Sequence, residues 1–563
     1  MSLFDLINMG TRGLAASQTS LDLVGQNVTN ADTAGYTRKR LNLEAGVRVD
    51  QGLGQMGFGV DVVSIKRMRD DLLDRQMQEV STQKGGREEL DKSLQAIQNI
   101  LTEPADSGLN TFLEKFWASW QDLANNPSDR TARQAVSDSG SALAGRFQDL
   151  GEQFNVLLNQ KNDEIVDGVG EINKLLQGIS EDNEAIANAE VGSARQRAND
   201  TRDQREEKFK ELSKYIEVSY SEDAQGRYLI TSGGNLLVGP AGSYPLKIAR
   251  SQITLSDGKE MSQASLVVSS TRQPYDPPGG KLASLMQARD EVIPRYQAAL
   301  DELARTIATS VNDQHKQGYT LSGFTGADFF DPATAGATSI KLSTFVRADV
   351  SNIAAAMGGT SRSLGAPLNQ VIPAAGAVLD LANTVNPDYR NLSSDSVIIR
   401  TVGPPSATLV EGSGEDYTVD YRTGQIRFNN PGTLLPGTAI TVDFRYTIQN
   451  YNGQGDGKNA LKIGQLAQAL LSNPDKTGVF RSTIGDSYAT MVGELGAEKK
   501  KAADTLETST NLQTYLQKRI DETSGVSMDE ELADMVRFQN CYQASAKYIS
   551  TVSQMMDSLM SIQ

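Results

Sequence analysis

The stretch that decides the fold is MVRFQNCYQASAKYISTVSQMMDSL, residues 535–559. Apolar or small residues recur in it at alternating spacings of three and four, which is typical of the seam along a supercoiled helix. The residues in this series are Met535, Phe538, Tyr542, Ser545, Ile549, Val552, Met556 and Leu559. The stretch therefore predicts a long carboxy-terminal helix with one narrow apolar stripe.

A matching series lies at the opposite end of the chain. It consists of Leu3, Ile7, Gly10, Leu14, Ser17, Leu21, Val24 and Val28. A glycine and a serine within the series permit close approach of another backbone. A narrow stripe on about 30 residues cannot form a globular core, and short isolated helices are marginal in water. Each end of the chain therefore needs a partner.

Two kinds of partner can satisfy these stripes. Packing on the protein's own body is the more general solution for a helix. Narrow stripes at both extremities favour pairing of the two ends with each other, and then with neighbouring subunits. We therefore assign the large members of both series to an assembly seam.

Residues 46–214 are predicted to form a helical bundle, because helical periodicity extends from residue 86 to residue 195. Five apolar residues of this region fall seven apart: Leu158, Ile165, Ile172, Ile179 and Ile186. The segment NNPSDR at 125–130 interrupts the pattern. Its asparagines and proline end one helix, and Ser128 or Asp129 is placed to cap the next.

Period-two patterns such as YIEVSY and RYLITS predict strands in the middle of the chain. Residues 215–330 are predicted to form a β-rich subdomain with a return helix, and residues 331–455 an inserted, β-sandwich-like outer domain. The helical bundle resumes over 456–519. Residues 1–45 and 520–563 are the two coiled-coil halves of an inner domain. The predicted fold class is α+β and multidomain: a discontinuous long-helix bundle with terminal coiled-coil helices, a β-rich subdomain and an inserted all-β domain.

The composition disfavours several classes of function. The 563 residues carry a formal net charge of -16, which argues against binding to nucleic acid or to an anionic membrane surface. The chain has one cysteine, Cys541, and one histidine, His315, so we expect no disulfide within the chain and no thiolate or imidazole metal cluster. We also find no signal-peptide pattern at the amino terminus and no stretch of membrane-spanning length, so neither Sec-type export nor membrane insertion is expected.

No segment of the sequence meets the requirements of a catalytic or cofactor-binding motif. GLGQMG at residues 52–57 has dinucleotide-binding spacing, but a strand pattern follows it where a helix is required, so its glycines are interpreted as turns. His315 is predicted at the surface or at a helix end. Cys541 is predicted to be a packed thiol, and Trp117 and Trp120 to be core residues. We expect no cofactor, and the chain is predicted not to be an enzyme.

The segment NVTNADTAGYTRKR, residues 27–40, follows the first predicted helix. Its asparagines and glycine can end a helix and adopt left-handed backbone angles, after which the chain becomes extended and basic. The segment resembles the signature of the flagellar rod, hook and hook-associated axial proteins. The residues that match this signature are Asn27, Asn30, Thr33, Gly35, Tyr36 and Arg38.

Five longer segments narrow the resemblance to the flagellar hook-associated protein 1 family. The most specific is GLNTFLEKFWASWQDLANNPSDRTARQAV at 108–136, and others begin at residues 199, 279 and 311. The fifth is SGVSMDEELADMVRFQNCYQASAKYISTVSQMMDSLM at 524–560, which contains the stretch quoted first. Two residues depart from the family pattern: Asp32 stands where asparagine is commoner, and Cys541 interrupts the usual run around Tyr542. Residues 331–455 show little likeness.

The resemblance implies a structural subunit of the bacterial flagellum at the hook–filament junction. It further implies export by the flagellar type III apparatus, an extracellular location and a ring of subunits. The implied partners are further copies of the chain, hook protein, hook-associated protein 3 and a flagellar export chaperone. Two alternatives stay open: another axial protein, such as hook protein or hook-associated protein 3, or an adhesin carried on flagellar export helices, with its activity in residues 331–455.

Overall fold

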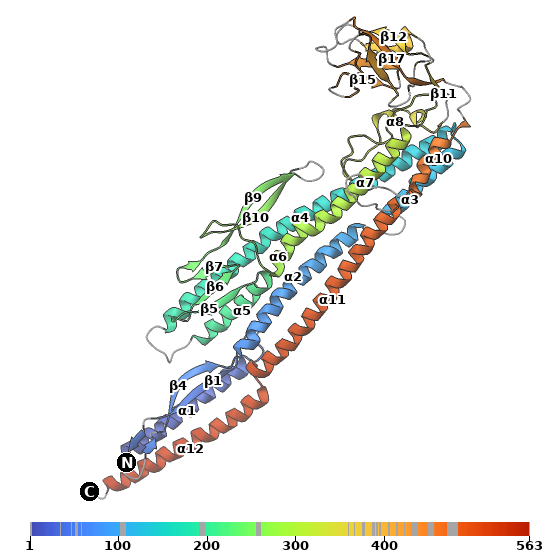
Figure 1. The fold of residues 1–563 in the computed structure, drawn as a ribbon. Coiled ribbons are helices and arrows are strands. Elements are labelled where there is room, and N and C mark those ends of the chain that lie inside the picture. The colour runs from blue at the N-terminus through green and yellow to red at the C-terminus, as the bar shows by residue number, and fades with distance from the viewer. Residues whose placement is uncertain are drawn as a thin grey trace.

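The chain forms an elongated rod with both termini at one tip and a small β unit at the other (Figure 1). The computed structural model describes residues 3–561 apart from 34, 47, 51–54, 58, 102–107, 191–197, 255–259, 358–359, 449–454, 470–481 and short gaps between 365 and 436. Long helices with several small antiparallel sheets confirm the predicted α+β class.

The first tip holds what we call the terminal unit, residues 3–67 and 528–561. In it the two end helices lie side by side, next to an antiparallel hairpin (Figure 1). Its elements are α1 (Leu3–Thr29), β1 (Lys39–Ala45), β2 (Arg48–Asp50), β3 (Gln55–Gly57), β4 (Val60–Arg67) and α12 (Met528–Met560). β1 pairs with β4, and β2 with β3. β4 confirms the strand predicted after GLGQMG, whereas Gly52 and Gly54 of that segment lie outside the described residues.

The middle of the rod is a helical body built from both halves of the chain. The helix leaving the terminal unit, α2 (Asp71–Leu101), packs along the returning α11 (Ile484–Ser524). The other helices of the body are α3 (Leu109–Asn125), α4 (Arg130–Glu190), α5 (Asn199–Tyr215), α6 (Gly280–Gln287), a π-helical turn (Ala288–Val292), α7 (Ile293–His315) and α10 (Lys458–Gln465).

Helix α4 is the spine of this body, and its sequence explains its limits. It begins directly after the predicted break at NNPSDR, where Asp129 Oδ1 accepts a 2.9 Å hydrogen bond from the backbone N–H of Thr131. Two apolar cores line it. The first surrounds Phe116 and Trp120, and the second contains the heptad residues Ile165, Ile172 and Ile179. Trp117 also lies in the first core, so the core assignment of both tryptophans is confirmed.

Two small sheets cover the second core. The four-stranded sheet has the order β5 (Ser219–Glu222), β6 (Tyr228–Ser232), β7 (Asn235–Gly239), β8 (Gly242–Ser243), and the ribbon pairs β9 (Leu246–Thr254) with β10 (Glu260–Val268). Asparagines of α4 bind the strand backbones: Asn183 exchanges two hydrogen bonds with Tyr228, and Asn173 two with Leu246. These reciprocal bonds fix the sheets on the helix because they satisfy backbone groups at the strand starts.

The second tip is a separate β unit with its own core around Ile399, Ile426 and Val442. Its sheets have the orders β11–β18, β12–β17–β14 and β13–β16–β15. The strands are β11 (Thr360–Ser363), β12 (Leu368–Val371), β13 (Val378–Asp380), β14 (Ile398–Thr401), β15 (Tyr417–Asp420), β16 (Gln425–Phe428), β17 (Ala439–Asp443) and β18 (Arg445–Ile448). The short helix α9 (Leu381–Thr384) packs on β13 and β16, whereas α8 (Thr344–Ala348) lies in the segment that precedes this unit.

Residues 331–356 pack with the helical body, not with this β unit. Ile340, Leu342 and Ile353 belong to the first apolar core. The backbone that leaves this core is held by buried polar side chains. Arg133 Nη1 donates to the carbonyl of Ile353 at 2.6 Å, and Asn459 Nδ2 donates to the carbonyl of Ala354 at 2.7 Å. We call this backbone around Ile353 and Ala354, which leads from the helical body to the β unit, the neck. Its hydrogen bonds to Arg133 and Asn459 fix the neck to the body.

His315 also lies at this neck. Of its two predicted positions, the surface or a helix end, it occupies the second, since it ends helix α7 and is fully buried. Its Nε2 accepts a 2.9 Å hydrogen bond from the backbone N–H of Ala354. The proton of the neutral ring therefore lies on Nδ1, which donates to the carbonyl of Ala327 at 2.6 Å. Burial lowers the pKa of His315 to about 4, although the bond to Ala327 partly opposes this shift.

This pKa predicts a pH-dependent stability. Above about pH 6.5 the histidine is neutral in the folded and unfolded chain, and its contribution is fully present. As the pH falls toward about 4, only the unfolded chain takes up the proton, and on the order of 3 kcal/mol is lost. We expect His315→Gln to lack this part of the slope. The measurement is the free energy of unfolding between pH 7 and 4 for both proteins, and parallel curves would contradict the assignment.

Candidate assembly site

Helices α1 and α12 approach each other closely at small residues. A Cβ atom added to Gly10 would lie 2.6 Å from Cγ1 of Ile549, and one added to Gly13 would lie 3.2 Å from Oγ of Ser545. Real Cβ atoms do not come as near as the first distance, so Gly10 is needed for this packing. The two chain ends therefore meet at Gly10, Ser545 and Ile549 of the two predicted series, and also at Gly13, which lies outside the series.

The buried face of α1 is wider than the stripe that a contact with α12 alone would cover. Val24 is buried, whereas Ile7, Leu14, Leu21 and Val28 are half-buried. The side chain of Leu3 lies outside the described part of the chain. The other deeply buried residues of α1 are Ala16, Ser17, Ser20, Leu23 and Asn27. Because α1 also contacts strands β1 and β4, its buried face extends beyond the predicted stripe.

The seam residues of α12 are much less covered. Val552 is the one buried member, while Met535, Phe538, Ile549 and Met556 are half-buried. Two members are exposed: Tyr542 retains 36% of its accessible surface and Leu559 retains 55%. Intramolecular pairing with α1 thus leaves part of the predicted seam open to solvent.

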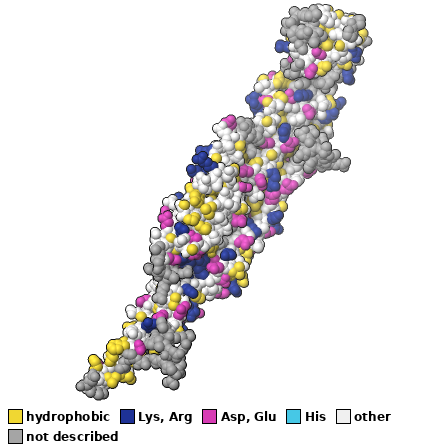
Figure 2. Space-filling model, turned by 60° about the vertical axis from the view of Figure 1, so that its left-hand side comes forward, with side chains coloured by type: hydrophobic (Ala, Val, Ile, Leu, Met, Phe, Trp, Pro, Cys, Tyr) yellow, Lys and Arg dark blue, Asp and Glu magenta, His cyan; other side chains and the backbone are white. Residues whose placement is uncertain are grey.

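Further apolar side chains extend the exposed face of α12. Leu532, Val536, Tyr548 and Met555 are all exposed, and hydrophobic side chains gather at this tip of the rod (Figure 2). Cys541 is also exposed, so its predicted packing as a buried thiol is wrong for the single chain. Cys541, Tyr548 and Met555 are seven residues apart and therefore lie on one side of the helix.

The signature residues tie the end of α1 to the hairpin and to α12. The side-chain carbonyl of Asn27 accepts hydrogen bonds from the Tyr36 hydroxyl at 2.9 Å and from the backbone N–H of Lys39 at 3.1 Å. Its amide donates to the Lys39 carbonyl and to Glu531, each at 3.0 Å. Burial, followed by the nearby carboxylates of Asp200, Asp203 and Glu531, raises the pKa of Tyr36, so its hydroxyl stays a donor.

Arg38 makes the charged part of the same arrangement. Its Nε donates to Glu531 and its Nη1 to Glu530, both at 2.7 Å. The carboxylates raise the pKa of Arg38 even though burial acts in the opposite direction. We call Asn27, Tyr36, Arg38 and Glu531 the clasp. It joins three elements of the terminal unit through one buried carboxylate.

The other signature residues shape the turn that precedes the clasp. Asn30 donates from its side chain to the carbonyl of Gln26 at 2.9 Å, which ends α1. The side chain of Thr33 donates to Asn30 at 3.4 Å. Gly35 has a φ of 78°, in the left-handed region that favours glycine. The sequence pointed to these residues, but it gave no sign that Glu531 would be their partner.

Comparison with known proteins identifies the protein family to which the chain is similar. Residues 94–330 match the helical domain of flagellar hook-associated protein FlgK, and residues 516–562 match the carboxy-terminal domain of flagellar basal body rod FlgEFG proteins. Flagellar hook-associated protein 1 of Bacillus subtilis is 27% identical over 99% of this chain and 97% of its own length. The chain belongs to the flagellar hook-associated protein 1 family.

A second relative supports the hook-associated protein 1 family over the whole length. Flagellar hook-associated protein 1 of Escherichia coli is 27% identical over 99% of both chains. The solved structure of the flagellar hook junction protein FlgK from Burkholderia pseudomallei has a similar fold, with a TM-score of 0.55 and 18% identity over 79% of this chain and 99% of that one. The family is one of structural flagellar proteins, which confirms the predicted class and the prediction that the chain is not an enzyme.

Two other features are absent from the part of the chain that the structure describes. Among the described residues, none of the helices combines the length and the apolar composition of a membrane span. Within the same described ranges, no group of three or more His, Cys, Asp or Glu side chains is arranged to hold a metal ion.

The clasp predicts unequal effects of two neighbouring substitutions. Glu531 is 1% exposed and bonds to both Asn27 and Arg38, so Glu531→Gln should destabilise the terminal unit by about 2–3 kcal/mol. Glu530 bonds to the same arginine with a side chain that is 64% exposed, so Glu530→Gln should cost less than about 1 kcal/mol. Hydrogen exchange of α1 and α12 amides measures both. Equal exchange in the two variants would contradict a clasp centred on Glu531.

Proposed function

We propose that this member of the hook-associated protein 1 family is a structural subunit of the hook–filament junction that joins its neighbours through the terminal unit. The observation that carries the proposal is the incompletely covered apolar face of α12, which includes Tyr542, Met555 and Leu559. A contiguous exposed apolar face at one tip of a soluble rod is characteristic of an interaction site.

The chemistry of this face fits burial against other helices. Burying apolar surface is favourable by roughly 25 cal/mol per Å² of area removed from water. A residue such as Met555, which is 53% exposed in the single chain, gains from that burial only when another subunit covers it. We therefore propose that the predicted seam residues are buried in two steps, first by pairing of α1 with α12 and then by contact between subunits.

The proposed partners follow from the family and from the position of this face. We propose that further copies of the chain form a ring, with hook protein on one side and hook-associated protein 3 on the other. A flagellar export chaperone and passage through the flagellar type III apparatus would precede assembly, and the final location would be extracellular. The β unit lies at the tip of the rod opposite the termini (Figure 1), so it is free of this contact and can face outward.

A charge in the seam should block assembly before it blocks folding. Ile549 packs against Gly10, and Ile549→Asp would bury an unpaired carboxylate there at a cost of about 2–4 kcal/mol. Gln554→Asp adds the same charge at an exposed position of α12 and is the matched control. In a strain lacking the native protein, we expect filaments with the control and hooks without filaments with Ile549→Asp. Motile cells carrying Ile549→Asp would exclude this seam as the assembly surface.

The outer domain should be dispensable for the junction if its boundary is chosen correctly. We place that domain at residues 358–455, because the preceding segment contributes Ile340, Leu342 and Ile353 to the core of the body. The backbone N–H of Met357 donates to Asp456 at 3.1 Å, so a short Gly/Ser linker can join these two residues. We expect this shortened protein to support filaments.

The matched control for that deletion joins residue 330 to residue 456. It also removes the apolar segment 331–356, so it should be secreted but misfolded or proteolysed. Motility and filament number measure the outcome for both. Loss of filaments with the shorter deletion, despite normal secretion and folding, would mean that the outer domain makes essential contacts.

A further inference from the structure

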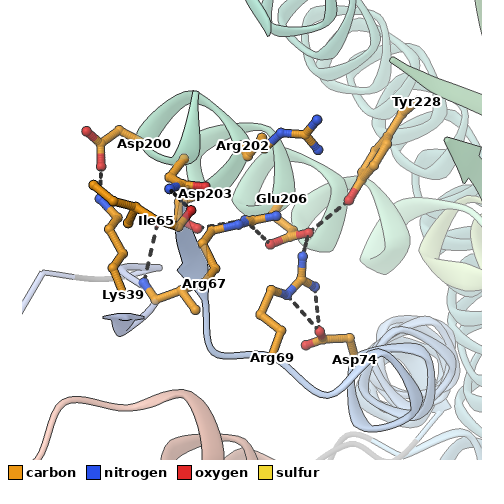
Figure 3. Close-up of polar contacts among 12 residues, drawn as sticks. Lys39, Ile65, Arg67, Arg69, Asp74, Asp200, Arg202, Asp203, Glu206 and Tyr228 are labelled. Atoms are coloured by element: carbon orange, nitrogen blue, oxygen red, sulfur yellow. Dashed lines mark hydrogen bonds and ion pairs between the residues drawn. The ribbon is translucent and has the colours of Figure 1, made fainter. Parts of the chain in front are cut away.

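The terminal unit and the helical body are joined by a layer of charged side chains. The chain crosses between them twice, at residues 68–70 between β4 and α2 and at residues 525–527 between α11 and α12. Beside the first crossing, basic residues of the hairpin face acidic residues of α5 (Figure 3). The basic side chains come from the terminal unit and its exit, whereas most of the acidic ones belong to the body.

The contacts in this layer are ion pairs and hydrogen bonds of good geometry. Arg67 Nη1 donates to Asp203 at 2.7 Å and to Glu206 at 2.9 Å. Arg69 donates to Glu206 and, through Nε at 3.0 Å, to Asp74. Farther along α5, Lys39 forms an ion pair with Asp200. One face of α5 thus binds both strands of the hairpin.

Neutral groups strengthen the same layer. The side chain of Asn199 donates to the backbone carbonyl of Ile65 at 3.1 Å. The hydroxyl of Tyr228 donates to Glu206 at 2.9 Å (Figure 3). Burial works against the ionised form of Glu206, yet Arg67 and Arg69 lower its pKa. Because Glu206 is shared by three partners, it is the centre of the layer.

These charges are buried, which makes their loss costly. The side chain of Arg67 is 10% exposed, and those of Asp203 and Glu206 are each 8% exposed. Buried ion pairs cost desolvation energy, so they add little net stability compared with apolar packing. They are directional, however, because each bond requires a particular placement of donor and acceptor. Such contacts are suited to fixing the angle between the terminal unit and the helical body.

Apolar packing does not fix the angle between the terminal unit and the helical body. Among the described residues, the four hydrophobic clusters contain no member from the terminal unit, and the nearest cluster joins Met77 and Val80 of α2 to Leu516 and Ile520 of α11, inside the body. A cleft of about 640 Å³ lies next to the joint, lined by Tyr36, Glu207 and Gln517 among others. The two parts therefore have room to move relative to each other.

We propose that Lys39, Arg67, Arg69, Asp200, Asp203 and Glu206 form an ionic latch that sets the angle between the terminal unit and the helical body. When the latch is released, the terminal unit pivots about residues 68–70 and 525–527 while both parts stay folded. The latch goes beyond the proposed function because it concerns the shape of the single chain. A subunit that pivots in this way can keep the packing of its terminal unit while its helical body lies at a different angle to that unit.

Distances between two spin labels test the latch. Cys541 is the only cysteine and is exposed on α12, and Ala185→Cys adds a second label at an exposed position near the end of α4. We expect a narrow distance distribution in this otherwise unmodified chain. In the Asp203→Asn, Glu206→Gln double variant we expect at least a twofold broader or shifted distribution, with unchanged helix content by circular dichroism.

The matched control is Glu211→Gln, which removes a half-exposed carboxylate from the same helix whose ion pair, with Lys214, lies within α5, and it should leave the distribution narrow. If the double variant does not fold, Arg67→Lys decides, because lysine keeps the charge but its shorter side chain does not place its nitrogen at the position of Nη1, which bonds both carboxylates. It should broaden the distribution to an intermediate degree. A broad distribution in the unmodified chain, or an unchanged narrow one in whichever variant folds, would overturn the proposal.

Discussion

Pairing of segments that are far apart in the sequence is the constraint on which the rest of the structure depends. Asn27 and Glu531, which bond directly, are 504 residues apart, and Lys84 and Gln513 are 429 residues apart. Closing loops of this length costs conformational entropy, so the paired helices cannot form until nearly the whole chain is available. The rod follows from this pairing, because outgoing and returning helices lie side by side and both ends share one tip (Figure 1).

Apolar packing and polar contacts have different tasks along this rod. The two cores beside α4 hold helices together without specifying one direction, since hydrophobic contact is proportional to area. Where parts with separate cores meet, the contacts are polar and directional. Arg133 and His315 fix the neck of the β unit, Arg67 and Glu206 join the terminal unit to the body, and Asn27 organises the turn between α1 and the hairpin.

The sequence could predict what depends on local periodicity. Heptad spacing and alternation identified the helices, the strands and the α+β class, because these patterns arise within one element. It could not show that Glu531 is the partner of Arg38, since a carboxylate in the first turn of a helix is common for local reasons. The burial of His315 and the docking of residues 331–356 likewise depend on distant segments. Cys541 was misplaced because an apolar neighbourhood along one helix does not say which faces are covered.

Helix α12 shows how little of this protein's terminal structure is explained by the single chain. Of its 33 residues, Glu531 and Val552 are buried, whereas α4 buries residues along its entire length. A long helix in water is stabilised mainly by packing, and the single chain gives α12 little packing beyond its contact with α1. A net charge of -16 keeps free chains apart through general repulsion, and association must then come from local complementarity of apolar faces. The poorly covered face of α12 is therefore consistent with a subunit whose fold becomes complete only in the assembled flagellum.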